Sequence, residues 1–503
     1  MTTTPRTLRD ERGLAMILAL FMTLALSVLG TSLMFVSKTE TLSSHNYRLM
    51  SQARYGAESG VHVASNYLLS TAYSGVMPNT AGDAWANYDT TKSPVTLVSN
   101  GNPIVLSSTS SSSNYPVTSV KTAFAAMFSG AAGTLDVNDA PVAFTATATL
   151  MSMRKFTDSM SGLETVLQTW EIVGEGSIVG ARNATVDVSS VLERQSQPLF
   201  PYAAFATYSG CEALDLAGGA VTDSYDSTAA LVGGVPVVAN NTGNLGTNGN
   251  LKEVGATTMV HGSLSTPRAG VGTCDDVQNV TALTQSGGAT VDSGINQLSQ
   301  PVNYPDPPAI SPLPPTTTTE FKQSTGCPSG YAGVCAPSAN GATFTPASAS
   351  TVITMGNVQM NANSVLHLNA GVYVMNSLKQ NGGAQLVVDS GPVIIKIAGQ
   401  SDSNPIVING NGIANPSFNP QNLQFIYGGN GLAKLNGGST TSATFYMPKA
   451  DTTINGGGAL YGALVAKTLK DTGGADIHYD RRLRTGGLTA GNYSLSAFTW
   501  KNY

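Results

Sequence analysis

Charged side chains are scarce in this chain. Asp, Glu, Lys and Arg make up 11% of its 503 residues, against roughly 25% in an average soluble protein. Glycine, hydroxyl and amide side chains are abundant instead, so solubility has to come from uncharged polar groups. This composition is typical of an extracellular, β-rich surface and disfavours a cytosolic enzyme.

Clusters of basic residues are also few. The chain has 25 Lys and Arg against 30 Asp and Glu, a net charge of −5, whereas phosphate binding needs basic side chains gathered on one surface. The basic cluster near the carboxyl end, Arg481, Arg482 and Arg484, is ordinary for a solvated turn. We therefore expect no nucleic acid among the partners of this protein.

Catalytic motifs are missing as well. The five histidines form no ligand pair on one helical face, and no GxSxG, HExxH or phosphate-loop pattern occurs. Six aspartates in the last third could supply a carboxylate pair for polysaccharide cleavage: Asp389, Asp402, Asp451, Asp471, Asp476 and Asp480. All but Asp402 stand beside residues typical of turns, where Asp is ordinary. We expect no enzyme, no catalytic residue and no cofactor.

Calcium is the one ion for which the sequence offers donors. Oxygen-bearing side chains stand close together at Asp136, Asn138 and Asp139, and again at Asp223 and Asp226. Neither group follows the EF-hand pattern, and hydrogen-bonded Asx turns account for both. The expectation is therefore no metal site, with calcium as the alternative.

Cysteine is limited to Cys211, Cys274, Cys327 and Cys335. An even number in a chain with export features predicts two disulfides in an oxidising compartment. Zinc is disfavoured, because no CxxC is present and no histidine is near in sequence. Four cysteines allow three pairings, and the sequence alone does not choose among them. The short loop from Cys327 to Cys335 favours a local bridge, which leaves Cys211 with Cys274.

What the sequence does contain is one long apolar run. Residues 14–36 carry no charge and form a helix of about 35 Å, enough to cross a bilayer core of about 30 Å. No proline interrupts residues 38–69, where apolar or small residues recur every three or four positions. One helix is therefore expected from Leu14 to Leu69, apolar all round in its first half and amphipathic in its second.

The polar arm before this helix, residues 1–13, fixes its orientation. Three arginines against two acidic residues keep this end cytoplasmic and place the rest of the chain outside. A cleaved secretory signal peptide is disfavoured, because the apolar run is longer than a usual h-region and no small-x-small site follows it. A plain single-pass anchor is the stronger alternative.

The amino terminus resembles a known family. A short basic leader ending in Gly13, an apolar helix directly after it, and ARYGAESGV at 53–61 are similar to the type IV pilus minor pilins of the PilX group. The resemblance implies that a prepilin peptidase cuts between Gly13 and Leu14 and that the mature helix packs against other pilins. Major pilins carry glutamate at the fifth mature position, where this chain has Leu18. Tip-located minor pilins and type II secretion pseudopilins also lack that glutamate, which implies a subunit at the filament end.

The next part of the chain indicates a small head. Residues 71–140 are mostly loop-like, with a helix expected at 120–128. Alternating apolar and polar residues predict strands at 142–154, 169–174 and 184–192. A long helix followed by an antiparallel meander resembles the build of a pilin head.

Beyond residue 200 the chain becomes rich in glycine turns. Asn-Gly-Gly or Thr-Gly-Gly signals at 436–438, 455–457 and 472–474 are 19 and 17 residues apart. Such spacing suits the coils of a parallel β-helix or solenoid, in which Asn and Gly turn the corners. A β-sandwich is the alternative, and the uniform corners favour the β-helix. Residues 460–483 also resemble a carboxyl-terminal domain of unassigned function on other PilX-type proteins.

The expected fold is α+β: a long pilin-type helix, a small antiparallel meander and a large all-β region, predicted to be a parallel β-helix. The expected divisions are a cytoplasmic leader at 1–13, the transmembrane pilin helix at 14–69, the head at 70–200, a Gly-rich β region at 201–300, a Pro/Thr-rich linker at 301–319 and a β-helix-like domain at 320–503.

These features predict a minor pilin, made as a precursor in the bacterial inner membrane and displayed at the cell surface in a type IV pilus. We expect it at or near the tip, supporting assembly and surface adhesion, with other pilins, the prepilin peptidase and a surface or glycan ligand as partners. The alternatives are a membrane-anchored adhesin, a β-helix carbohydrate-active enzyme and a secretion pseudopilus subunit.

Overall fold

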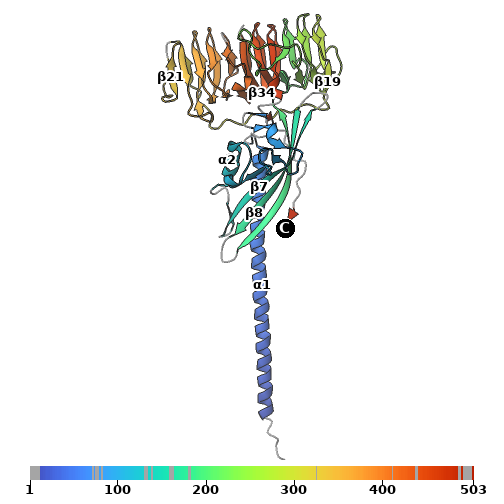
Figure 1. The fold of residues 1–503 in the computed structure, drawn as a ribbon, viewed down its shortest axis with the longest axis vertical. Helices are drawn as coiled ribbons and strands as arrows, with labels where there is room; N and C mark the ends of the chain where they lie inside the picture. Colours follow the sequence, from blue (N-terminus) through green and yellow to red (C-terminus); the bar gives the residue numbers. More distant parts are fainter. Residues whose placement is uncertain are drawn as a thin grey trace, which may run out of the picture.

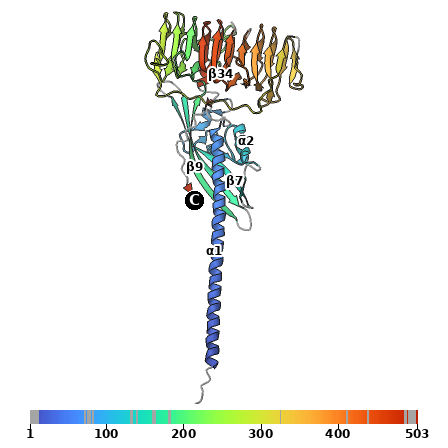
Figure 2. The same cartoon turned by 180° about the vertical axis from the view of Figure 1, so that it is seen from behind.

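A long helix, a small sheet and a transverse stack of strands make up the molecule (Figure 1). This computed structural model describes residues 12–70, 73, 79–80, 83–129, 134–137, 140–157, 164–178, 183–323, 326–409, 412–436, 440–484, 489–490 and 501–502. The helix forms a stalk, the sheet packs beside its upper half, and the stack lies crosswise above both. The view from behind shows the same three levels (Figure 2).

Helix α1 (Arg12–Leu69) is continuous over 58 residues, which confirms the expected long helix. Residues 14–47 are exposed on every side. In the second half a stripe of small and apolar side chains is fully buried, namely Ala53, Ala57, Val61, Ala64 and Leu68. Their spacing by threes and fours places them on one helical face, which packs on the sheet.

The sheet beside α1 is antiparallel. Its main strands are β7 (Ala140–Thr157), β8 (Glu164–Ile178) and β9 (Ala184–Pro198), which contain the three expected strands and confirm the meander. Shorter elements complete this part: β1 (Asn79–Thr80), β2 (Asp83–Ala84), η1 (Trp85–Asn87), β3 (Tyr88–Asp89), β4 (Thr96–Leu97), β5 (Val105–Ser107), η2 (Ser110–Ser112), α2 (Thr118–Ala126), β6 (Thr134–Val137), β37 (Thr489–Ala490) and β38 (Lys501–Asn502). We call residues 70–198 with β37 and β38 the head.

Glycines let the helix and the sheet approach closely. A Cβ atom added at Gly174 or Gly176 of β8 would collide with backbone atoms of α1, and one at Gly60 would collide with the Thr145 carbonyl of β7. Beside this contact Trp170 is fully buried. The Arg194 guanidinium lies 4.7 Å from the centre of the Tyr73 ring. Among the described residues, Arg194 is the one fully buried arginine or lysine, and it lies against this aromatic face.

Residues 201–484 form stacked coils, which we call the coiled region. Each coil contributes strands to three faces, and most strands pair in parallel with the strand three places later in the chain. Its first part contains β10 (Ala204–Ala206), β11 (Leu214–Ala217), β12 (Val221–Tyr225), β13 (Leu245–Thr247), β14 (Leu251–Val254), β15 (Met259–Val260), β16 (Leu264–Thr266), β17 (Leu283–Ser286), β18 (Thr290–Val291) and β19 (Ile295–Gln297).

The second part of the coiled region continues the same pattern. Its elements are β20 (Thr318–Phe321), β21 (Cys335–Ser338), β22 (Gly341–Phe344), β23 (Val352–Thr354), β24 (Asn357–Met360), β25 (Val365–Leu368), β26 (Gly371–Met375), β27 (Ser377–Gln380), β28 (Gln385–Val388), β29 (Val393–Ile397), β30 (Ile406–Ile408), β31 (Ile413–Ala414), η4 (Pro420–Asn422), β32 (Leu423–Tyr427), β33 (Ala433–Asn436), β34 (Thr440–Asn455), β35 (Ala459–Asp471), β36 (Asp476–Asp480) and η5 (Arg481–Arg484).

The corners of the coils explain the repeated Asn-Gly signals. The Asn436 side-chain nitrogen donates to the Asn409 oxygen at 3.0 Å, and Asn455 donates in the same way to Asn436 at 2.9 Å. Inside the stack apolar side chains from successive coils lie over one another, as the stacked rings of Phe425 and Phe445 do at 4.7 Å. One coil therefore buries its inner side chains only against the next.

The two parts of the coiled region share one sheet. Strand β10 pairs with β13 on one side and with β35 on the other, and Leu214 stands in register with both Leu251 and Leu469. The chain thus builds its first coils outward from the middle, crosses to the far end, and builds the remaining coils back to the middle (Figure 1). The division that the sequence suggests between 201–300 and 320–503 does not separate two bodies.

The Pro-rich segment is a strap along the stack. It is held at intervals: the amide nitrogen of Val302 donates to Asn248 at 2.8 Å, and the Gln400 side chain donates to the Pro314 carbonyl at 2.8 Å. Between these points the Lys449 ammonium meets Asp306 at 2.5 Å. Side chains of the stack donate to the strap carbonyls of Val302, Pro305 and Pro314, so these three carbonyls have partners without strand pairing.

The coiled region is an insertion in the head. Pro198, the last residue of β9, pairs with Thr489 of β37 in the antiparallel head sheet. The chain leaves the head at this pair and returns to it after residue 484. The coiled region is therefore inserted between β9 and β37, two neighbouring strands of the head sheet.

Candidate assembly helix and surface pocket

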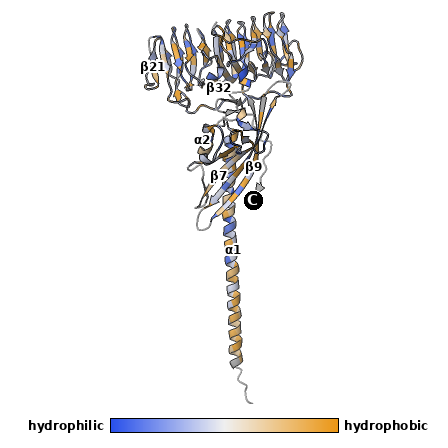
Figure 3. Cartoon of the chain, viewed as in Figure 1, coloured by the Kyte–Doolittle hydropathy of each residue, from blue (hydrophilic) through white to orange (hydrophobic). Residues whose placement is uncertain are grey.

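The lower half of α1 is the most apolar exposed surface of the molecule. Its large side chains from Leu14 to Val36 are 52–77% exposed, and the hydropathy colouring shows an orange stalk below the head (Figure 3). Leu14–Leu69 is the one candidate membrane span among the described residues. An apolar rod of this length is stable in lipid or against other helices, and not in water.

The predicted cleavage point lies at the start of this rod. Gly13 and Leu14 are in the first turn of α1, and the Leu14 side chain is 65% exposed. Leu18 is likewise exposed, and the first carboxylate along the helix is Glu40. The apolar half of α1 therefore presents no negative charge to a neighbouring amino terminus.

Polar side chains within the rod are satisfied by the helix itself. Ser27 donates to the Thr23 carbonyl at 2.8 Å, and Thr31 donates to the Ser27 carbonyl at 2.8 Å. Gly30 has no neighbour within 4 Å of an added Cβ. These small residues leave a smooth strip on which a second helix could pack closely.

Both predicted disulfides are present. Cys211 is bonded to Cys274, and Cys327 to Cys335. The first links loops that are 63 residues apart, and the second closes a loop of 8 at the beginning of β21. The first bridge therefore joins two irregular connections, and the second ties an irregular connection to the first residue of β21.

The six aspartates considered for catalysis have structural partners. Asp389 makes a hydrogen-bond contact with the His367 imidazole at 2.9 Å, and ion pairs hold Asp402 to Lys379 at 2.7 Å and Asp451 to Lys467 at 3.3 Å. Backbone amides hold the others: Gly473 and Ala475 donate to Asp471, Val221 donates to Asp476, and Ser227 and Arg482 donate to Asp480. Burial raises the pKa of Asp471 to about 6 against these hydrogen bonds.

The structure describes some of the possible calcium donors. Asp223 meets the imidazole of His478 at 2.5 Å, while Asp226 accepts from the Thr228 hydroxyl and amide in a local turn. Asn138 and Asp139 lie outside the described residues. Within the described part of the chain, no three His, Cys, Asp or Glu side chains group as a metal site.

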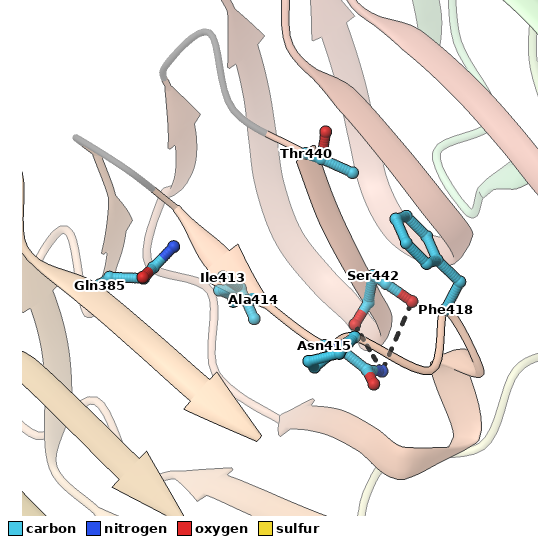
Figure 4. A pocket seen from close by; sticks show the side chains of 8 residues that line it. Gln385, Ile413, Ala414, Asn415, Phe418, Thr440 and Ser442 are labelled. Atoms are coloured by element: carbon cyan, nitrogen blue, oxygen red, sulfur yellow. Dashed lines mark hydrogen bonds between the residues drawn. The ribbon is translucent and has the colours of Figure 1, made fainter. Parts of the chain in front are cut away.

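A pocket of about 390 Å³ opens between β31 and the beginning of β34 (Figure 4). On this face β31 pairs with β28, and residues 440–443 pair with β35. No ladder joins β31 to β34 among the described strands. The Asn415 side chain bridges the two by donating to the Ser442 carbonyl at 3.2 Å, so the pocket is a wedge closed at that end.

Phe418 forms one wall of this wedge in an unusual conformation. Its φ is +48°, in the left-handed region that bulky side chains rarely adopt. The Tyr225 hydroxyl donates to its carbonyl at 2.8 Å, and the ring of Tyr461 lies 5.0 Å away at a steep angle. The half-buried Phe418 ring is thus held in place from behind.

Sequence patterns do not indicate this pocket. Its side chains come from three segments of the chain that are brought together only by the stacking, and none of them belongs to a motif. The left-handed backbone of Phe418 is also hidden, because Asn, Asp or Gly is the usual sign of such a position.

A long helix whose second half packs on an antiparallel sheet, with its first half bare and apolar, defines a pilin-type subunit. Residues 12–62 match the family model described as PilX N-terminal, so the amino-terminal segment is similar to that of PilX-type minor pilins. Residues 353–486 match a domain of unknown function, DUF7305. The match at the amino terminus supports a component of a type IV pilus, and it covers most of α1 and none of the coiled region.

A solved structure, the competence-associated pilin ComZ from Thermus thermophilus, is similar at 11% identity over 90% of this chain and 98% of that chain, with a TM-score of 0.24. The two molecules do not superpose as whole bodies at this score. No curated protein matches the chain in sequence.

Proposed function

We propose that this protein is a minor pilin at or near the tip of a type IV pilus, where it supports assembly and surface adhesion. The observation that carries the proposal is the pairing of a bare apolar rod at one end with a broad stack of strands at the other (Figure 3). The rod leaves the membrane by packing against the helices of other pilins. The stack then faces outward.

Two features favour the tip over the shaft. The stack lies across the top of the head and is wider than it (Figure 1), so a subunit placed directly above would meet it. Leu18 also stands where an internal subunit would offer a carboxylate to its neighbour's amino terminus. A carboxylate left unpaired among apolar helices is costly, and a terminal subunit has no use for one.

We further propose that a prepilin peptidase frees the helix by cutting between Gly13 and Leu14, from a precursor held in the inner membrane. The coiled region is proposed to be a parallel β-helix that binds a surface ligand and catalyses no reaction. The engagement of its aspartates by lysines, histidine and backbone amides supports binding over chemistry.

The test is mass spectrometry of filaments sheared from cells. We expect the protein in the filaments at a small ratio to the major subunit, with a mature amino terminus at Leu14. A Gly13→Val variant should remain an uncut precursor in the membrane, while Thr4→Val in the same leader should be processed normally. A Leu14 terminus in the Gly13→Val variant, or absence of the wild-type protein from filaments, would refute the proposal.

A further inference from the structure

We propose that the wedge pocket between β31 and β34 binds one residue of a neutral sugar, with the Phe418 ring against a face of the pyranose. This inference deepens the adhesive role proposed above and rests on it. Three observations carry it: a strained aromatic wall, polar groups without partners, and the absence of charge among the described lining residues.

The aromatic wall is held at an energetic cost. A phenylalanine at a φ of +48° occupies a sparsely populated backbone region that other contacts have to maintain. The Tyr225 hydroxyl fixes its carbonyl, and the Ser417 hydroxyl bonds to Asn415 and so anchors the preceding residue. The strained backbone places the half-exposed Phe418 ring at the mouth of the wedge.

The polar groups of the wedge are of two kinds. Asn415 is fully used, because its amide nitrogen donates to Asn419 and Ser442 and its oxygen accepts from Ser417. The Gln385 amide and the Thr440 hydroxyl, in contrast, make no hydrogen bond to any described residue, and both line the opening (Figure 4). An amide and a hydroxyl can each donate and accept, as sugar hydroxyls do.

The lining decides the class of ligand. Gln385, Thr440, Asn415 and Ser442 are neutral, as are the apolar residues beside them. An acidic sugar or a charged peptide would bury its charge there without a partner, which is costly. A purely apolar ligand would cover the Gln385 and Thr440 groups and leave them unpaired. A pyranose offers an apolar face to Phe418 and hydroxyls to the two free side chains.

The experiment measures binding of neutral methyl glycosides to the full-length chain in a detergent that contains no sugar. Saturation-transfer NMR with methyl glycosides of glucose, galactose, mannose and N-acetylglucosamine should show saturable binding of at least one of them. Phe418→Gly removes the ring and also the backbone strain, so it should fold as well as the wild type and bind about tenfold or more weakly. Phe418→Tyr should keep most of the affinity.

Matched variants locate the site. Gln385→Ala should weaken binding several-fold, whereas Tyr208→Ala, which removes an exposed aromatic ring elsewhere on the stack, should leave it unchanged. Binding of none of the four glycosides, or equal binding by Phe418→Gly and the wild type, would overturn the inference. Filament assembly by Phe418→Gly separates the two proposals, because the minor-pilin role predicts normal incorporation of this variant whatever its sugar affinity.

Discussion

At the scale of single residues, the stability of the fold should depend on pH through the buried carboxyl of Glu253. Its side chain is fully buried inside the stack, where one oxygen accepts from Gln285 at 3.0 Å and the other has no partner among the described residues. Burial raises the pKa of this carboxyl from 4.5 to about 7. The folded chain therefore holds a proton that the unfolded chain has already released at neutral pH.

This difference in pKa makes the folded state less stable at higher pH. Because the pKa of Glu253 is higher in the folded state, the folded state loses stability as pH rises from 4.5 to about 7, by about 3 kcal/mol in total. Glu253→Gln keeps the hydrogen-bonding shape without the titration. We expect its coiled region to melt at the wild-type temperature at pH 5 and at a higher temperature at pH 8, as followed by circular dichroism.

Asp471 is the natural control for this measurement, since its own raised pKa, about 6, acts in a lower pH window. The loss of stability between about pH 6 and 7 should disappear in Glu253→Gln and persist in Asp471→Asn. An unchanged slope in Glu253→Gln would show that the carboxyl is ionised at little cost.

At the scale of elements, the contact between α1 and the head sheet depends on missing side chains. Gly60→Ala should gain helix propensity, yet its Cβ would collide with the Thr145 carbonyl. We expect a net loss of about 1–3 kcal/mol in the free energy of unfolding of the head. Gly30→Ala, in the same helix with open space around it, should not destabilise the head, and equal melting of the two variants would contradict the packing described.

The two disulfides should differ in their contribution. Loop-closure entropy predicts about 4 kcal/mol for the 63-residue separation of Cys211 and Cys274 and about 2.5 kcal/mol for the 8-residue separation of Cys327 and Cys335. Serine at both positions of the first pair should therefore lower the denaturation midpoint of the coiled region more than at the second pair. The reverse order would indicate that local strain or residual structure outweighs chain entropy.

Elements with a strong local signal could be predicted from the sequence. The apolar run at 14–36 and the stripe through Ala53, Ala57 and Val61 indicated α1, alternation indicated β7, β8 and β9, and loop lengths favoured the disulfides found. Asn-Gly corners indicated stacked coils in the second part, because an amide ladder such as Asn436 to Asn455 requires the same residue at each turn.

The arrangement of the coils could not be predicted. Leu214 lies in register with Leu469, a contact between positions that share no local pattern. In the first part, long connections between β12 and β13 and between β16 and β17 interrupt the repeat, so its period was hidden. The wedge pocket arises where one rung of one face fails to pair, and such a failure depends on packing and has no motif.

At the scale of the whole molecule, the stack and the head are joined as insertion and host. Since Pro198 and Thr489 are already paired, replacing residues 199–488 with Asn-Gly should close an ordinary two-residue hairpin. We expect this short chain to fold as a head on its helix, to enter filaments, and to lose surface adhesion. Filament preparations probed by immunoblotting, with cell-binding counts alongside, would measure both properties.

Two other results of replacing residues 199–488 would contradict this expectation. A short chain that is degraded or stays in the membrane would mean that the head depends on the stack above it for stability. Retained adhesion would instead assign attachment to the head.

The pairing of β10 with β35 has a consequence for biogenesis. Export delivers the beginning of the chain first, so the early coils keep an unpaired strand edge until β35 (Ala459–Asp471) pairs with β10. A truncated product would keep that strand edge unpaired and prone to aggregation. The junction between the two parts of the coiled region therefore closes last, and only the completed chain has no unpaired edge at β10.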